Sequence, residues 1–167
     1  MGLTLRPASM ADAERLLAWR NDPVTRAMSG GGEIVGMDEH LAWLGQRLVD
    51  VQTLLLIGEL EGSARGMVRF DRAASGAAEV SINVAPEARS QGLGFELLRV
   101  GCEACLARGF ASCLTARIRP ANRASLSIFE KAGFRVSDAA DPAMLILTRD
   151  PVPAAPQSGA PHVDCSP

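Results

Sequence analysis

A glycine-rich hexapeptide is the clearest chemical signal in this sequence of 167 residues. It reads Arg89-Ser90-Gln91-Gly92-Leu93-Gly94 and lies between an apolar strand pattern and an apolar helical pattern. Glycine lets backbone amides approach a ligand closely. The start of a helix offers unpaired N–H groups and the positive end of the helix dipole to an anion. The hexapeptide therefore predicts an anion cradle that suits a pyrophosphate.

Other interpretations of the hexapeptide differ in the ligand they imply. A dinucleotide-binding fingerprint needs a third glycine where this chain has Leu97, and a P-loop needs a Gly-Lys-Ser/Thr sequence that does not occur here. A tight strand-to-helix turn without any ligand is the remaining alternative. The charge distribution favours an anion, because residues 89–135 carry 8 basic and 3 acidic side chains, whereas residues 1–88 carry 8 basic and 12 acidic ones.

Two flanking blocks extend this signal. Val84-Ala85-Pro86 precedes the hexapeptide, and one helix and one strand later the chain reads Asn122-x-x-Ser125-x-x-Ile128-Phe129-Glu130-Lys131-x-Gly133-Phe134. The two blocks, with Arg-x-x-Gly-x-Gly between them, resemble the GNAT superfamily of N-acetyltransferases. The resemblance covers residues 3–148. It implies an α/β fold: a mixed, mostly antiparallel sheet with a splayed parallel pair and flanking helices.

The resemblance also implies an acetyl-CoA site and no metal ion. Pantetheine would lie in a gap between the strands at 77–84 and 111–118, and the diphosphate would lie on the amides of the glycine-rich turn. Asn122 would contact the pantetheine arm or the thioester. The cofactor-binding residues that this predicts are Ile82, Val84, Arg89, Ser90, Gln91, Gly92, Leu93, Gly94, Asn122, Ser125 and Phe129.

Amide formation needs a base for the acceptor ammonium group and a route for the thiolate to leave. Glu79 is the expected base, because it lies on the polar face of a strand whose other face is apolar; a solvated or ion-paired strand glutamate is the alternative. Phe129 stands where many family members have a tyrosine, and the chain has no tyrosine. We therefore expect Ser125 to assist the thiolate, with water as the alternative, and an N–H near Val84 to polarise the carbonyl.

The acceptor amine is indicated by two shorter patterns. Trp19-Arg20-Asn21-Asp22 and His40-x-x-Trp43 resemble a GNAT branch that acetylates amino sugars in nonulosonic (pseudaminic-type) acid synthesis. The ribosomal-protein N-terminal acetyltransferases share part of these patterns. The resemblance implies that Trp19, Asn21, His40 and Trp43 bind the acceptor, and helix-core packing is the alternative. The predicted reaction is acetyl transfer to the primary amine of a small molecule, and the first candidate for this acceptor is a nucleotide-linked amino sugar. A protein N-terminus, or a non-catalytic acetyl-CoA-binding module, are the alternatives.

The spacing of apolar residues predicts the elements that position these groups. A helix that begins at Ser9, with Asp12 completing a capping box, ends at Asn21-Asp22-Pro23, and residues 29–32 form a loop. Three strands form an antiparallel meander before the glycine-rich turn. The predicted strands are 3–6, 53–60, 64–70, 77–84, 111–118, 134–136 and 144–148, and the further helices are 38–49, 93–108 and 121–132.

Composition and length limit the classes of protein. Residues 1–149 are predicted to form one domain and residues 150–167, with five prolines, a disordered tail. The sequence has no membrane-spanning apolar run, no secretory signal and no basic stripe for nucleic acid. Cys102 and Cys105 are expected in the core of a helix rather than on zinc. We expect a cytoplasmic enzyme, monomeric or homodimeric.

Overall fold

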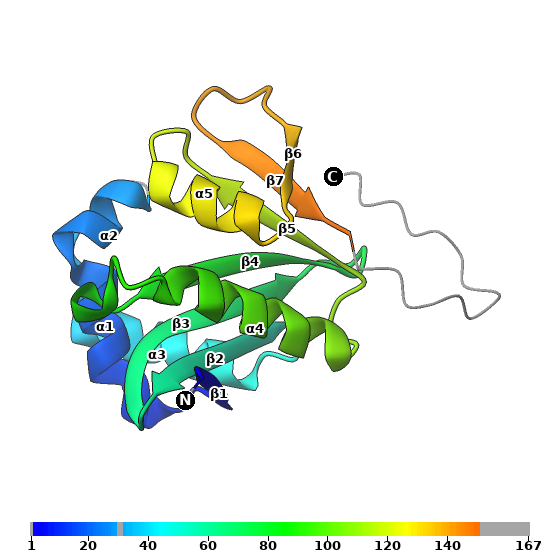
Figure 1. Ribbon diagram of the computed structural model, residues 1–167. Coiled ribbons are helices and arrows are strands. Elements are labelled where there is room, and N and C mark those ends of the chain that lie inside the picture. Colours follow the sequence, from blue (N-terminus) through cyan, green and yellow to red (C-terminus); the bar gives the residue numbers. More distant parts are fainter. Residues whose placement is uncertain (1, 30–31, 151–167) are drawn as a thin grey trace.

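The computed structural model describes residues 2–29 and 32–150, in which one seven-stranded sheet separates two groups of helices (Figure 1). The strands are β1 (Thr4–Pro7), β2 (Thr53–Leu60), β3 (Ser63–Arg72), β4 (Ala77–Val84), β5 (Cys113–Ile118), β6 (Arg135–Asp138) and β7 (Leu145–Arg149). Their order in the sheet is β1-β2-β3-β4-β5-β7-β6, and every neighbouring pair is antiparallel except β4 and β5. The predicted α/β fold, its antiparallel meander and its parallel pair are confirmed.

Helices cover both faces of the sheet. They are the short η1 (Met10–Asp12) and η2 (Pro86–Ala88), and α1 (Ala13–Asn21), α2 (Pro23–Met28), α3 (Met37–Val49), α4 (Leu93–Ala107) and α5 (Arg123–Lys131). In Figure 1, α4 and α5 lie in front of the sheet, and α1 and α3 lie behind it.

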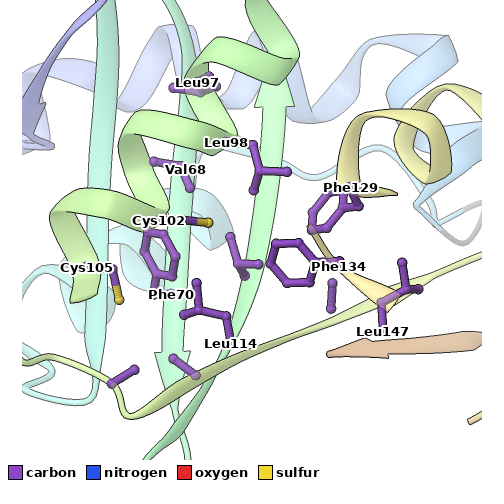
Figure 2. Close-up of a cluster of buried hydrophobic side chains, with 14 of the residues drawn as sticks. Val68, Phe70, Leu97, Leu98, Cys102, Cys105, Leu114, Phe129, Phe134 and Leu147 are labelled. Atoms are coloured by element: carbon purple, nitrogen blue, oxygen red, sulfur yellow. The ribbon is translucent and has the colours of Figure 1, made fainter. Parts of the chain in front are cut away.

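The alternation of side chains along the strands creates two cores. Val68 and Phe70 of β3 point toward α4, where they pack with Leu98, Cys102 and Leu114 (Figure 2). Side chains on the other face of β2 pack against α1 and α3 in a second cluster that includes Trp19 and Leu44. Apolar residues two positions apart share a face of a strand, so each strand contributes to one core with every second residue.

The parallel pair at the centre of the sheet is short. Its register joins Ala77 to Cys113, Ala78 to Leu114 and Glu79 to Thr115, and ends there. β4 continues to Val84 and β5 to Ile118, and these two ends diverge in Figure 1. The divergence places a gap at the carboxyl ends of two adjacent parallel strands.

Helix α2 is the main element that the sequence did not predict. The expected end of the preceding helix is correct, because Asp22, the residue before proline, is extended with ψ of 133°. The chain then starts a new helix at once, since Pro23 suits a first helical position and the Asp22 side chain accepts a hydrogen bond of 2.9 Å from the Thr25 amide.

Two of the expectations fall on residues outside the described chain, and two others can be compared with the structure. Residues 30–31 of the predicted loop and 151–167 of the predicted tail lie outside the described residues, so the loop and the domain boundary at 149 stay predictions. Ser9 and Asp12 form the expected capping box, although the first turn is a 3₁₀ helix. No helix in the described part of the chain is long and apolar enough to cross a membrane.

The cysteine pair lies in the core, as expected. Cys102 and Cys105 are buried and free, and burial raises the pKa of their thiols to about 12 and about 11. Among residues 2–29 and 32–150, no group of three or more histidine, cysteine or acidic side chains is placed to hold a metal ion. The Cys-x-x-Cys sequence is therefore a packing feature of α4.

Candidate active site

The larger of two neighbouring cavities, of about 370 Å³, lies where β4 and β5 diverge. Strand β4 supplies one wall, and β5 with the start of α5 supplies the other. The lining residues are Arg20, Thr25, Met28, Ser29, Met67, Arg69, Val80, Ser81, Ile82, Asn83, Arg117, Ile118, Arg119, Asn122, Ser125, Phe129 and Met144. Of the predicted cofactor-binding residues, Ile82, Asn122, Ser125 and Phe129 meet at this cavity.

Backbone amides of β4 face the gap. The amide of Ala85 donates to the carbonyl of Arg65, at 2.9 Å, on the β3 side. Peptide groups alternate between the two edges of a strand, so the amides of Val84 and Ile82 face the opposite edge, toward β5. An extended chain lying in the gap would find these two donors, and their pairing with pantetheine stays a prediction.

The glycine-rich turn forms the entry to α4. Gly92 caps the helix with φ of +77°, a left-handed conformation that glycine adopts without strain, and Ser90 also has a positive φ of 61°. Gly94 packs close to α5, since a Cβ there would lie 2.9 Å from Cδ1 of Ile128, and that side-chain end would have to shift. The turn therefore presents backbone rather than side chains at the helix N-terminus, which suits an anion.

Arg89, predicted to bind the cofactor, already has protein partners. Its Nη2 donates to Asp22 Oδ2 at 2.7 Å and to Thr25 Oγ1 at 2.9 Å. The guanidinium holds the pKa of the Asp22 carboxyl below its usual range. Thr25 in turn lies 3.3 Å from Asn83 Oδ1 on β4, to which its hydroxyl donates. The Arg89 side chain thus connects the turn to α2, and the turn's backbone remains for a ligand.

The start of α5 places the second block at the cavity. The Asn122 side chain caps the helix by accepting a hydrogen bond of 3.1 Å from the Ser125 amide. Phe129, one turn further on, is buried and packs edge-on against Phe134 at 4.9 Å between ring centroids (Figure 2). The cavity wall therefore offers the Ser125 hydroxyl and an apolar ring where a tyrosine would supply a phenol.

Glu79 belongs to the last register pair between the parallel strands β4 and β5. It pairs with Asp71 on β3 and with Thr115 on β5, and it lines neither cavity. Ser81, two residues further along the same face of β4, does line the larger cavity. The expected base therefore does not itself line the cavity between β4 and β5.

The smaller cavity, of about 310 Å³, lies against α1 and α3. His40 and Trp43 line it, with their rings stacked at 5.5 Å and 27° between planes. Burial lowers the pKa of His40. The lining residues are Leu16, Arg20, Val35, Glu39, His40, Trp43, Met67, Arg69 and Asn83.

The other two residues predicted to bind the acceptor have packing roles. Trp19 is 6% exposed within the second core and lines neither cavity. The Asn21 side chain forms two hydrogen bonds of 2.9 Å with the backbone of Val35, one in each direction. Since Val35 lines the smaller cavity, Asn21 shapes that cavity indirectly.

Two arginines that the sequence analysis did not select stand where the cavities meet. Arg20 and Arg69, together with Met67 and Asn83, line both cavities. Arg69 Nε donates to Asp71 at 2.7 Å, and its guanidinium lies 5.7 Å from the centre of the Trp43 ring. Arg20 Nη1 is buried with no hydrogen-bond partner among the described residues. The sequence pattern that begins at Trp19 therefore marks the right segment, but Arg20 rather than Trp19 lines the cavities.

A comparison with protein families agrees with this geometry. Residues 2–135 match the family described as acetyltransferase (GNAT) domain. The chain belongs to this family. It is an N-acetyltransferase, as the two sequence blocks predicted.

Individual GNAT proteins are similar over most of the chain. The L-methionine sulfoximine/L-methionine sulfone acetyltransferase of Pseudomonas aeruginosa is 27% identical over 143 residues, which are 82% of this chain and 83% of that protein. A structure of YncA, a candidate acetyltransferase from Salmonella typhimurium with its cofactor acetyl-CoA, has a TM-score of 0.74 at 23% identity, over 95% of this chain and 100% of that one. A candidate phosphinothricin N-acetyltransferase has a TM-score of 0.74 at 27% identity, over 89% and 98%.

Proposed function

We propose that the chain transfers the acetyl group of acetyl-CoA to the primary amine of a small molecule that also carries an acid group. The observation that carries this proposal is the pair of arginines, Arg20 and Arg69, where the two cavities meet. Guanidinium groups bind carboxylates and related oxyacids through paired N–H donors. An acid held at this junction leaves an adjacent amine close to the gap between β4 and β5.

The acetyl donor occupies the larger cavity in this proposal. The pantetheine arm pairs with the amide of Val84, and the diphosphate lies on the amides of Gln91, Gly92 and Gly94 at the start of α4. The similar structures of YncA and of an aminoglycoside acetyltransferase contain acetyl-CoA and coenzyme A, respectively. Asn122 sets the start of α5 beside the thioester end of the cavity.

The reaction follows from these positions. The neutral amine attacks the thioester carbonyl, and the Ile82 amide, which faces the same gap, stabilises the oxyanion that forms. Glu79 accepts the amine proton through water or Ser81. The carbon–sulfur bond then breaks, and the Ser125 hydroxyl donates a hydrogen bond to the departing thiolate. Phe129 keeps this end of the cavity apolar.

The structure favours an acid-bearing amine over a nucleotide-linked amino sugar. A nucleotide base would need an aromatic side chain such as Trp19 or Trp43 to stack on, and Trp19 is buried in the second core. Trp43 has a stacked His40 beside it and the Arg69 guanidinium 5.7 Å from its ring centre. The relatives named for methionine sulfoximine and phosphinothricin act, by those names, on amino-acid analogues, which combine an amine with a carboxylate.

Release of free coenzyme A across a panel of amines tests the proposal. The panel contains L-methionine sulfone, the same amine without its carboxylate, a nucleotide-linked amino sugar and a peptide with a free N-terminus. We expect turnover of the amino acid, with an Arg20→Met variant raising its KM about tenfold or more. Arg135→Met, at an exposed position on β6, is the control. Equal use of the decarboxylated amine would overturn the assignment of the acid site.

A further inference from the structure

Two buried polar atoms of the smaller cavity's lining residues have no hydrogen-bond partner among the described residues. They are Nη1 of Arg20 and Nε2 of His40. Buried polar atoms of folded proteins are nearly always hydrogen-bonded. Both residues line the same cavity, so unmet hydrogen-bonding capacity borders it, and a ligand with a complementary group for each atom would satisfy it. Arg20 can only donate, so its complement is an acceptor such as the acid group.

The hydrogen bond that the His40 ring makes determines whether its other nitrogen is a donor or an acceptor. The ring makes a hydrogen bond to the backbone of Ala13 that favours the protonated ring, so the ring donates to the Ala13 carbonyl. Because Nε2 has no partner, the donating nitrogen is Nδ1. In a neutral imidazole the other nitrogen is then an acceptor. Nε2 of His40 consequently requires an N–H or O–H donor.

The His40 ring is held in place. It is 4% exposed, lies on α3, and stacks on Trp43 at 5.5 Å. The charged groups that line the same cavity are Arg20, Arg69 and Glu39, of which Glu39 is exposed. His40 lines only the smaller cavity, whereas Arg20 lines both. The histidine therefore lies further from the gap between β4 and β5 than the junction does.

We propose that His40 selects acceptor amines by a hydrogen-bond donor at the end remote from the acid. This proposal rests on the function proposed above: Arg20 takes the acid at the junction, the amine faces the thioester, and the side chain extends into the smaller cavity. The acceptor class is then an amino acid whose side chain ends in an imino, amide or hydroxyl group. His40 is a specificity-determining residue, and it takes no part in the acetyl transfer itself.

L-Methionine sulfoximine and L-methionine sulfone are a matched pair for testing this rule. They differ at sulfur, where the sulfoximine has an N–H group and the sulfone has an oxygen. We expect the sulfoximine to have a kcat/KM about tenfold higher, mainly through KM, since an unsatisfied buried acceptor costs about that factor. Equal values, or a preference for the sulfone, would overturn the proposal while leaving acetylation of acid-bearing amines intact.

Variants of His40 separate selection from folding. His40→Phe keeps an aromatic ring against Trp43 but removes the acceptor nitrogen, so the ratio of the two kcat/KM values should fall to near one. His40→Gln retains an acceptor oxygen and should restore part of the preference. Gln46→Ala, on the exposed side of α3, is the control and should behave as the parent.

A pH series and an amine without an acid group distinguish failure of the His40 proposal from failure of the proposed function. A pH series of the parent should show the sulfoximine preference declining in acid, where a protonated His40 donates at Nε2 instead of accepting. A preference that persists unchanged in acid overturns the assignment of His40. If neither amino acid reacts but an amine without an acid group does, the proposed function is wrong. The proposed selection by His40 is then wrong as well.

Discussion

Nη2 of Arg89, in the turn before α4, lies 2.7 Å from Oδ2 of Asp22, between α1 and α2. The same nitrogen donates to Thr25, whose hydroxyl donates to Asn83 on β4. Asn83 and Thr25 both line the larger cavity. Three segments that are distant in the sequence are therefore linked, and the link runs from the expected diphosphate site to the wall shared with the acceptor.

This ion pair should act as a unit. Arg89→Gln and Asp22→Asn should each raise the acceptor KM by a similar factor, and the double variant should lose little more than either single one. Both side chains are partly buried, with 28% of Arg89 and 15% of Asp22 exposed, so we expect a coupling energy of about 1 kcal/mol. Steady-state kinetics of the four proteins measures it. Strictly additive effects would show that the two side chains act separately.

The positive φ of Gly92 predicts a specific loss of acetyl-CoA affinity. A valine there is strained at φ of +77° and crowds the amides of the turn, so calorimetry should show binding weakened about tenfold or more. Gly45→Ala is the matched control, because that glycine is within α3 with nothing near its missing Cβ. It should stabilise the fold by about 0.5–1 kcal/mol and leave the affinity unchanged. Unaltered affinity of Gly92→Val would remove the turn from the cofactor site.

Glu79→Gln tests the proton acceptor. Loss of a general base typically lowers the rate about 10²–10⁴-fold, and the deficit should shrink at high pH, where more of the amine is already neutral. Acetyl-CoA affinity should be retained. Because Glu79 lines neither cavity, Ser81→Ala should reproduce part of the effect if the proton passes that way. A pH–rate profile of Glu79→Gln that overlays the parent would exclude Glu79.

Ser125 and Phe129 test how the thiolate leaves. Ser125→Ala should lower kcat with little change in KM, because the hydroxyl interacts with a charge that develops during the reaction. Phe129→Tyr should restore turnover in that background, since the ring borders the cavity and its added hydroxyl supplies a proton donor. Full turnover of Ser125→Ala from pH 6 to about 9 would assign the role to water, as a thiol pKa of about 8.5 permits.

His40 should also make stability depend on pH. Burial lowers its pKa below the ordinary 6.5, so protons bind the unfolded chain more readily, and the free energy of unfolding should fall as pH drops below 6.5. The Asp12 carboxyl, whose pKa is lowered by Arg6, contributes its own loss only below 3.8. Denaturant unfolding of the parent and His40→Phe between these values isolates the histidine. Identical slopes for the two proteins would contradict the assigned burial.

Apolar alternation and capping residues determined which elements were predictable. The ranges 53–60 and 77–84 agree with β2 and β4, because an alternating or continuous apolar run directly marks a strand. Helix α2 escaped prediction since it has six residues and buries none of them. The site was harder for a geometric reason. Successive residues of a helix differ in direction, so Arg20 lines the cavities while Trp19, one position earlier, lies in the core.

The place of Arg69 in the site depends on the pairing of β3 with β4, which the sequence pattern does not specify. It is opposite Ser81 in the register of β3 and β4, on the face that carries Asn83 and Met67. That register brings Met67 and Arg69 of β3 beside Asn83 of β4, and these three residues line the smaller cavity. Without it, Arg69 is one of several arginines in a strand of mixed composition.

The early end of the parallel pairing at Glu79 and Thr115 gives the molecule an open strand edge in its interior. Outer edges of sheets invite pairing with other chains, but here β5 and α5 stand across the gap from Val80–Val84 and shield that edge. In the function proposed above, the extended thioester arm enters this gap and pairs with the free edge. The break that divides the sheet would then act as a template, and the bound substrate would complete the sheet for the length of one catalytic cycle.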